Sequence, residues 1–300
     1  MLGNNIPTYL RQNYDKFCQT LLILLGILSL AWYLGANPAS LVKEKPNALS
    51  VSPTAISFNW FELFKNAIRY VQVSNISEQE EVEIGKQINQ KLLTQQYKLH
   101  HSSQIQKYAD KIGQELVASS NSRNIPYTFQ VVMGEEVNAF ATPGGFVYLT
   151  TGLLKEADNQ AQLASAIAHE IAHINQKHHL KALKQAVLAQ GIAETAGINT
   201  NTLAQIGYQL AIELPQSREH EYEADRIGLE ILRAAGYSPL AFVNFLKQLE
   251  AKGTQPEFLR THPTSANRIE ALTQEIGATQ ISSHKGQSQA AYRNNVLSLL

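Results

Sequence analysis

Two histidines and a glutamate stand at a spacing that suits metal-dependent hydrolysis. In the stretch SAIAHEIAHINQKHH, residues 165–179, His169 and His173 are four residues apart and Glu170 lies between them. Positions i and i+4 of a helix lie one above the other, so both imidazoles can point at one place, which suits two ligands of a zinc ion. Glu170 lies about a quarter-turn round the helix, where it can reach a water on the metal and act as its base. We therefore expect His169 and His173 to bind the metal and Glu170 to be catalytic.

The helix that would carry this motif is apolar on almost every side. Asn159 can cap a helix over residues 160–178, in which Leu163, Ile167 and Ile171 accompany several alanines. Such a helix is expected to be buried, and two imidazoles with a carboxylate are costly there unless they have a partner. A chance match is the alternative, because His-Glu-x-x-His alone gives false positives. The buried context favours a metal as the partner.

A third ligand is expected from the stretch SREHEYEADRIGLEIL, residues 217–232. Catalytic zinc needs three protein ligands and an open position. Glu221 and Asp225 are four residues apart and share a helix face, which suggests Glu221 as ligand and Asp225 behind it, hydrogen-bonded to a ligand histidine. Glu219 and Glu223 are then expected to face solvent. The alternative is that these acids only complement the dipole at the start of a helix.

Four ordered blocks carry a resemblance to a known family. HEIAH followed downstream by SREHEYEADRIG resembles metallopeptidase family forty-eight, the group of the HtpX-like heat-shock proteases and the CAAX prenyl proteases. Two further stretches are similar to that family, NAFATPGGFVYLTTGLL at residues 138–154 and HPTSANRI at residues 262–269. The resemblance covers roughly residues 78–277, which makes it far more specific than the histidine motif alone.

The resemblance implies a gluzincin-type site with one Zn²⁺ per chain. On this basis the metal is held by His169, His173 and Glu221, Glu170 is the base, and Asp225 stands behind a ligand. The polytopic members of the family have several membrane spans, whereas this chain has one possible span and looks more like a soluble or singly anchored bacterial branch. Export-linked quality control is therefore favoured over processing of prenylated proteins.

The segment GGFVYLTT is expected to line the substrate cleft as an edge strand. Protease substrates commonly bind in an extended form by adding a strand to such an edge, and glycines let a backbone approach closely. An ordinary hairpin is the alternative. The expected substrate-binding residues are Gly144, Gly145, Phe146, Val147, Tyr148 and Leu149.

The segment FLRTHPTSANRIE is expected to come near the metal. Pro263 fixes an extended backbone at His262, and Arg268 follows one to two helical turns later. Either His262 or Arg268 can act as a catalytic group that stabilises the oxyanion or holds the substrate carbonyl. His262 can also cap the open zinc position in a resting state. In the remaining interpretation His262 is a surface residue and Arg268 pairs with a nearby acid.

The chain divides into a short N-terminal region and one large domain. Residues 21–34, LLILLGILSLAWYL, form an apolar run typical of a signal peptide or an uncleaved membrane anchor. Cys18 is the single cysteine, so neither an intramolecular disulfide nor a cysteine-type zinc cluster is available. The expected regions are a signal peptide or anchor at 1–39, a proline-containing linker at 40–57, an amphipathic helix on the membrane surface or the domain at 58–76, the zinc metallopeptidase domain at 77–277, and a C-terminal tail at 278–300.

The order of elements predicts an α+β fold that is mainly α. Helices come first, then three short strands at 127–133, 138–143 and 146–151, then more helices. This is expected to be a gluzincin-type zinc metallopeptidase domain with a small β-sheet beside the active-site helix. The formal net charge is +0 and no basic stripe is present, which argues against a nucleic-acid partner.

These features together predict a zinc-dependent metalloendopeptidase that acts in protein quality control at or outside the membrane. Its expected partners are protein or peptide substrates and, through the N-terminal segment, the membrane, with the catalytic domain extracytoplasmic (periplasmic). The main alternative is a zinc-stabilised chaperone or binding module with little proteolysis, and a weaker one is a non-peptide metallohydrolase. Glu170 favours the peptidase, because a binding module has no need of a base.

Overall fold

The computed structural model describes residues 76–189, 199–213, 217–251, 256–263, 266–277 and 283–300. All of them belong to one compact unit that spans residues 59–300. The expected apolar segment, linker and amphipathic helix lie outside the described residues. Within the described part of the chain, no helix is both long enough and apolar enough to cross a membrane.

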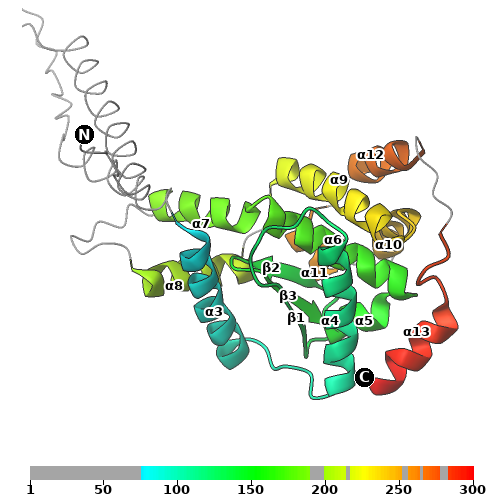
Figure 1. The fold of residues 1–300 in the computed structure, drawn as a ribbon, viewed down its shortest axis with the longest axis horizontal. Coiled ribbons are helices and arrows are strands. Elements are labelled where there is room, and N and C mark those ends of the chain that lie inside the picture. Colours follow the sequence, from blue (N-terminus) through cyan, green and yellow to red (C-terminus); the bar gives the residue numbers. More distant parts are fainter. Residues whose placement is uncertain (1–75, 190–198, 214–216, 252–255, 264–265, 278–282) are drawn as a thin grey trace, which may run out of the picture. The chain divides into compact units, whose positions relative to one another are not determined.

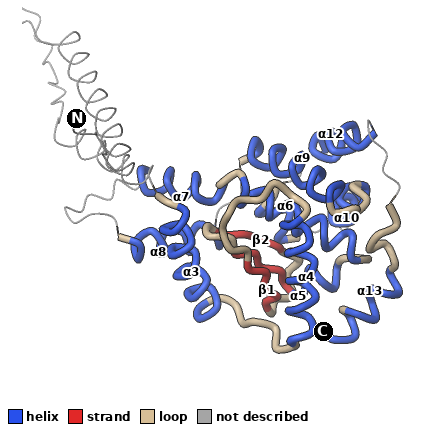
Figure 2. The backbone as a smooth tube through the Cα atoms, viewed as in Figure 1, coloured by secondary structure: helices blue, strands red, loops and turns tan. Residues whose placement is uncertain are grey.

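Three short strands form a sheet in the middle of the domain (Figures 1 and 2). They are β1 (Thr128–Val132), β2 (Ala139–Thr142) and β3 (Phe146–Thr150). The order is β1-β3-β2, with β1 parallel and β2 antiparallel to β3. All three expected strands are present, and the mainly helical α+β fold is confirmed.

The strand order corrects the expectation that GGFVYLTT is a sheet edge. β3 pairs on one side with β1 and on the other with β2, so both rows of its backbone groups are already used and cannot receive a substrate strand. Strand addition to β3 therefore cannot be the reason for the expected substrate-binding set, which is Gly144, Gly145, Phe146, Val147, Tyr148 and Leu149. The two glycines, with φ of 83° and 90°, instead turn β2 back onto β3.

Helices cover both faces of this sheet. Successive side chains of a strand point to opposite faces, and here both faces are apolar and belong to two separate clusters. On β3, Val147 and Leu149 enter one cluster and Phe146 and Tyr148 enter the other. The first face packs on α4 (Ser103–Ala118) and α6 (Gln160–Asn175), and the second packs on α3 (Glu78–Gln95), α7 (His178–Ala189) and α8 (Thr200–Glu213).

The motif helix α6 begins and ends for identifiable reasons. Asn159 caps it as expected, its side chain accepting the N–H of Gln162 at 3.1 Å. The helix ends at Asn175, before the expected residue 178, because Lys177 adopts a left-handed φ of 57°. The chain turns there, and α7 begins at the next residue, His178.

The second site helix, α9 (Arg218–Ala234), packs directly on α6. Ser217 caps it, accepting the N–H of His220 at 3.3 Å. The two backbones are close at Gly228, where a Cβ would lie in ordinary van der Waals contact with the backbone nitrogen of His169, at 3.4 Å. The functional side chains therefore stand on two helices whose spacing is fixed by packing.

The C-terminal segment packs on the domain, although a tail was expected from residue 278. Tyr292 and Val296 are buried in the main apolar cluster. The hydroxyl of Tyr292 donates to the carbonyl of Leu154 at 2.8 Å, and the N–H of Ala161 donates to the carbonyl of Gly286 at 3.0 Å. The remaining elements are α5 (Thr151–Glu156), α10 (Leu240–Ala251), α11 (Glu257–Thr261), α12 (Ala266–Gly277), α13 (Gln289–Asn295) and the 3-10 helix η1 (Leu297–Leu299).

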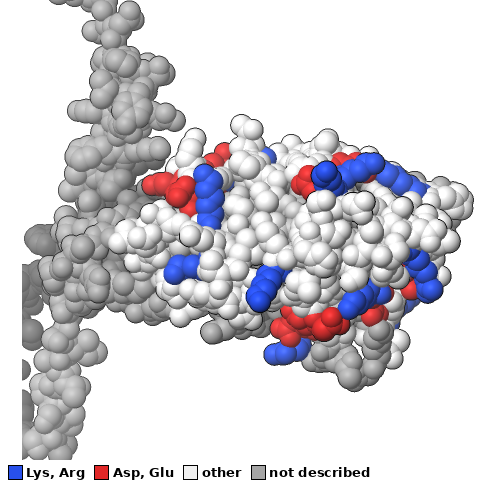
Figure 3. Space-filling view, turned by 90° about the horizontal axis from the view of Figure 1, so that it is seen from below, with Lys and Arg blue, Asp and Glu red and all other residues white. Residues whose placement is uncertain are grey.

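Acidic and basic side chains are mixed on the face drawn in Figure 3, where they lie in small groups among uncharged surface. The full chain has 25 basic and 25 acidic residues. A balanced surface of this kind produces no long-range field of one sign.

Helix α3 braces the turn between β2 and β3. The N–H of Gly144 donates to Glu81 Oε1 at 3.3 Å, and Arg123 Nη2 donates to Glu81 Oε2 at 2.6 Å. Gly85 faces the same turn, and a Cβ built on it would lie 2.2 Å from the carbonyl oxygen of Pro143. Because that oxygen belongs to the backbone, the contact cannot be relieved by a rotamer change.

We expect Gly85→Ala to lower the free energy of unfolding by about 1–3 kcal/mol, the usual cost of overpacking. Urea unfolding followed by circular dichroism measures this. Gly277→Ala is the matched helix control, since a Cβ there meets nothing within 4 Å. Equal stability of the two variants would show that α3 does not press on the turn.

Candidate metal centre and active site

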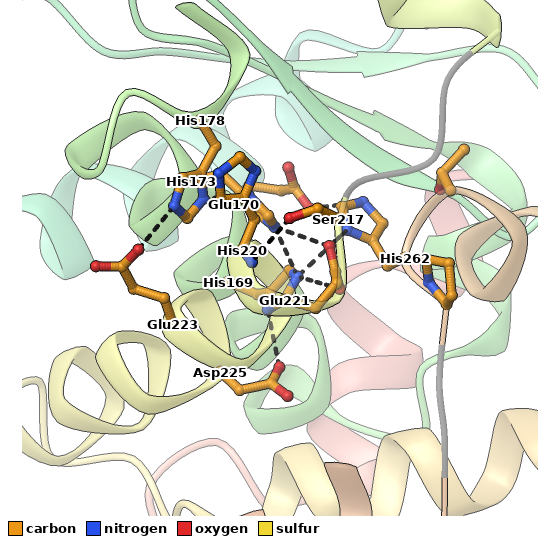
Figure 4. Close-up of polar contacts among 12 residues, drawn as sticks. His169, Glu170, His173, His178, Ser217, His220, Glu221, Glu223, Asp225 and His262 are labelled. Carbon is orange, nitrogen blue, oxygen red and sulfur yellow. Dashed lines mark hydrogen bonds and ion pairs between the residues drawn. The ribbon is translucent and has the colours of Figure 1, made fainter. Parts of the chain in front are cut away.

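Four buried side chains from three parts of the chain converge on one point (Figure 4). His169 and His173 come from α6, Glu221 comes from the first turn of α9, and His262 follows α11 as its C-cap. His173 Nε2 lies 3.0 Å from His169 Nε2 and 3.3 Å from Glu221 Oε1. His262 Nδ1 lies 3.3 Å from His169 Nε2 and 3.1 Å from Glu221 Oε1.

These four groups fit a divalent cation of the zinc type. Zinc ligands at ~2.0–2.1 Å in a tetrahedron are about 3.3 Å from one another, which is the spacing seen here. The donor set is three imidazole nitrogens and a carboxylate, which is a common choice for zinc. Without a cation, this many lone pairs would face one another inside an apolar core. The structure thus brings together the three expected ligands and adds His262 in the fourth position.

The electrostatics of Glu221 and His173 suit metal binding. Burial opposes ionisation of Glu221, yet its contacts with His262, His169 and His173 hold the pKa of this carboxyl well below its usual range. Burial lowers the pKa of His173 well below the usual histidine value, and so keeps this imidazole neutral. An anionic carboxylate and a neutral imidazole are the forms that coordinate zinc.

Glu170 lies beside the ligands and is fully buried. Its Oε1 is 3.2 Å from His262 Nε2. Burial raises the pKa of Glu170 to about 8, partly offset by His262 and by the backbone N–H of Ala141. A divalent cation at the convergence point would favour the ionised form and bring the group toward the range of a general base.

The outer edge of β2 runs past these groups. The N–H of Thr150 donates to the carbonyl of Asn138 at 3.1 Å, so the alternation of an antiparallel ladder directs the backbone groups of Ala139 and Ala141 away from β3. The carbonyl of Ala139 lies 3.3 Å from His262 Nε2. Among the described strands, the sheet edge at the site therefore belongs to β2 and not to the expected β3.

Asp225 and Arg268 stand behind the ligands. Asp225 Oδ1 lies 3.2 Å from His169 Nδ1, as expected for a residue that orients a ligand. Arg268 donates from Nε and Nη2 to the two oxygens of Asp225, both at 2.7 Å, and its Nη1 lies 2.7 Å from Glu221 Oε2. Nη1 also donates to the backbone carbonyls of His262 and Pro263.

This arrangement corrects the expected catalytic role of Arg268. Its side chain is buried and its donors point at protein acceptors, so it cannot touch a substrate carbonyl. Of the alternatives considered, pairing with a nearby acid is the one observed. The interpretation of His262 as a surface residue is wrong as well, since only 2% of it is exposed.

Sequence reasoning missed two groups near the metal ligands. His178 is fully buried, with Nδ1 2.9 Å from His173 Nδ1, and its Nε2 contacts Glu223, a residue expected to face solvent, whose side chain is 39% exposed. His179 lines a cavity beside the β2 edge, together with Phe140, Ala141, Leu210, Ala211, Thr261 and His262. The adjacent pair of histidines soon after the motif was the available signal, but its direction depends on the turn at Lys177.

We expect Glu221→Ala to lose most of its zinc, because a ligand is removed, and Asp225→Asn to bind zinc about 10- to 100-fold more weakly. Metal content and competition with a chromophoric chelator measure both effects. Glu219→Gln is the control on the same turn of α9, since Glu219 is exposed. A full equivalent of tightly bound zinc in purified Glu221→Ala would place the third ligand elsewhere.

Comparison with known proteins agrees with this geometry. A family model described as Peptidase family M48 matches residues 103–276, which include all four convergent side chains. The "Beta-barrel assembly-enhancing protease" of Yersinia pestis is 35% identical over 183 residues, and that of Escherichia coli (strain K12) is 31% identical over 199 residues. The "Mitochondrial metalloendopeptidase OMA1" of Arabidopsis thaliana is 33% identical over 180 residues.

These matches cover 54%, 61% and 57% of this chain, respectively. They cover only 37%, 38% and 36% of the relatives, so the chain corresponds to well under half of each of them. The family model also matches more than half of the present sequence, and the matched residues span both α6 and α9. The chain belongs to peptidase family M48.

Proposed function

We propose that this protein is a zinc-dependent metalloendopeptidase that hydrolyses peptide bonds with Glu170 as its base. The observation that carries the proposal is the convergence of His169, His173 and Glu221, with Glu170 beside them and a free strand edge alongside. Membership of peptidase family M48 supports the same conclusion.

The chain's own residues have distinct tasks in this mechanism. Zinc, when bound, supplies a Lewis acid and lowers the pKa of water. Glu170 accepts the proton of the attacking water and returns it to the leaving amine nitrogen. Asp225 and Arg268 hold His169 and Glu221 in place throughout.

We propose the outer edge of β2 as the place where the substrate binds in an extended form. The backbone groups of Ala139 and Ala141 point outward beside Glu170, and a peptide added there would place a carbonyl near the metal. In this proposal β2 replaces β3 as the strand to which the substrate is added. The proposal keeps the physical reason, which is that main-chain hydrogen bonds bind a substrate with little regard to its sequence.

His262 holds this site closed. Its Nδ1 would supply a fourth ligand to the metal, while Nε2 reaches the carbonyl of Ala139 and the carboxylate of Glu170. A substrate carbonyl beside Glu170 would compete with this imidazole for the same place, so we assign His262 to a resting state.

The cellular role that fits best is quality control of proteins at or outside a membrane, with the domain extracytoplasmic and held there or exported by the N-terminal segment. The apolar run at residues 21–34 and the names of the bacterial and mitochondrial relatives motivate this proposal. A zinc-stabilised binding module is disfavoured, because burying Glu170 beside Glu221 costs stability that such a module would not recover.

Glu170→Gln tests the peptidase assignment. The metal ligands remain, so we expect the variant to keep its zinc and its fold while peptide hydrolysis falls by at least 10²- to 10⁴-fold, the usual contribution of a general base. Casein or unfolded membrane-protein substrates, read by the new N-termini produced, provide the assay. Cleavage at the wild-type rate would refute the mechanism.

His262→Ala tests the resting state. With zinc saturating, we expect kcat/KM to rise, because neither the fourth ligand position nor the β2 edge needs to be vacated. A large loss of kcat with zinc retained would instead identify His262 as a catalytic donor. Unchanged kinetics and zinc content would show that His262 does neither.

A further inference from the structure

The buried imidazole of His178 stands between a metal ligand and the protein surface. It is the first residue of α7, and the left-handed turn at Lys177 brings it back beneath the end of α6. Its Nδ1 lies 2.9 Å from His173 Nδ1, and its Nε2 lies 3.1 Å from Glu223 Oε2 (Figure 4). The ring of His220 stacks on it, with centroids 4.0 Å apart and planes 14° from parallel.

Glu223 is the outermost of three groups in a row, and it determines which nitrogens of His178 and His173 donate and which accept. An ionised carboxylate only accepts, so Glu223 requires the proton of neutral His178 to be on Nε2. The Nδ1 of His178 is then an acceptor, and it requires the proton of His173 to be on Nδ1. This leaves His173 Nε2 with a free lone pair, directed at the other three convergent groups.

We propose that His178 and Glu223 form a positioning pair that fixes the tautomer and the ring plane of His173 for metal binding. The pair does for His173 what Asp225 with Arg268 does for His169, except that an imidazole is inserted between ligand and carboxylate. The inference rests on the proposed metal site and deepens it, because it adds to the site two residues that do not touch the metal.

The location of His173 explains why an intermediate imidazole is needed. His173 lies in the last turn of α6, and His178 comes from the element that follows. The Glu223 side chain is 39% exposed, whereas that of Glu221, two residues earlier on α9, is 0% exposed. α9 thus contacts His173 directly through Glu221 and indirectly through Glu223, so His173 is held from two sides.

A purely structural interpretation is that His178 only ties α7 to α9. Two substitutions separate it from the proposal. The Oδ1 of His178→Asn takes the place of Nδ1, so the acceptor for His173 is kept while the contact with Glu223 is lost. The side-chain amide of His178→Gln takes the place of Nε2, so the contact with Glu223 is kept while the acceptor for His173 is lost.

The experiment measures zinc affinity on the full chain, by competition with a chromophoric chelator after removal of metal. We expect His178→Gln to bind zinc about 10- to 100-fold more weakly than wild type, and His178→Asn to stay within about three-fold of it. Glu223→Gln should fall between them, because its amide accepts from His178 more weakly than a carboxylate and can also donate to Nε2, which permits the His178 tautomer that offers His173 no acceptor. The Oδ1 of His178→Asn, in contrast, accepts from His173 without help from Glu223. Glu219→Gln is the matched surface control, and thermal unfolding of the zinc-free proteins verifies their folding.

The outcomes separate this inference from the assignment of the metal site. If wild type binds no zinc, the proposed function fails. If wild type binds zinc but His178→Gln binds it as tightly as His178→Asn or wild type does, the positioning pair alone is overturned. Should His178→Gln be unfolded without zinc, Glu223→Gln decides, since wild-type affinity in that variant also contradicts the proposal.

Discussion

The structure depends on one electrostatic constraint, the concentration of acceptor atoms inside an apolar core. Three imidazole nitrogens and the carboxylate of Glu221 lie within 4.8 Å of one another, all of them buried, and Glu170 adds a further carboxyl beside them. Such a group is unfavourable in a low-dielectric interior unless a cation neutralises it. Much of the surrounding framework serves to hold these acceptors at a separation that only a small cation suits. Helix α9 packs directly on α6, and Arg268 lies behind the converging groups, where it pairs with Asp225 and Glu221.

Local sequence was sufficient to predict the parts of the site that depend on helix geometry. The i, i+4 spacing of His169 and His173 and of Glu221 and Asp225 is a property of a single helix, so it could be read without a tertiary structure. The caps at Asn159 and Ser217 are local for the same reason. The likeness to a peptidase family then supplied the pairing of the two helices, which periodicity alone does not give.

The errors occurred where position depends on contacts distant in sequence. The stretch GGFVYLTT gives no indication that β1 pairs with the side of β3 opposite β2. An edge strand was therefore expected, but β3 is the central strand of the sheet. Arg268 was expected to face substrate because it shares a helical face with His262, but its direction is decided by Asp225 on another helix. His178 was overlooked because only the left-handed turn at Lys177 directs it to His173, and a lysine carries no signal for that conformation.

The four candidate ligands differ in what holds them, and this difference supports the proposal that His262 is the one displaced by substrate. His169 is supported by Asp225, His173 by His178, and Glu221 by Arg268, all from behind the site. The side chain of His262 is held from the front, by the carbonyl of Ala139 and the carboxylate of Glu170. An extended peptide on the β2 edge would offer an N–H to that same carbonyl and a carbonyl oxygen to the metal. Such a peptide would take over the contact of His262 with the Ala139 carbonyl and its place among the candidate ligands, and would leave the supports of the other three groups intact. Displacement of this one ligand is thus compatible with a preorganised site, because it leaves the other three ligands and their supports intact.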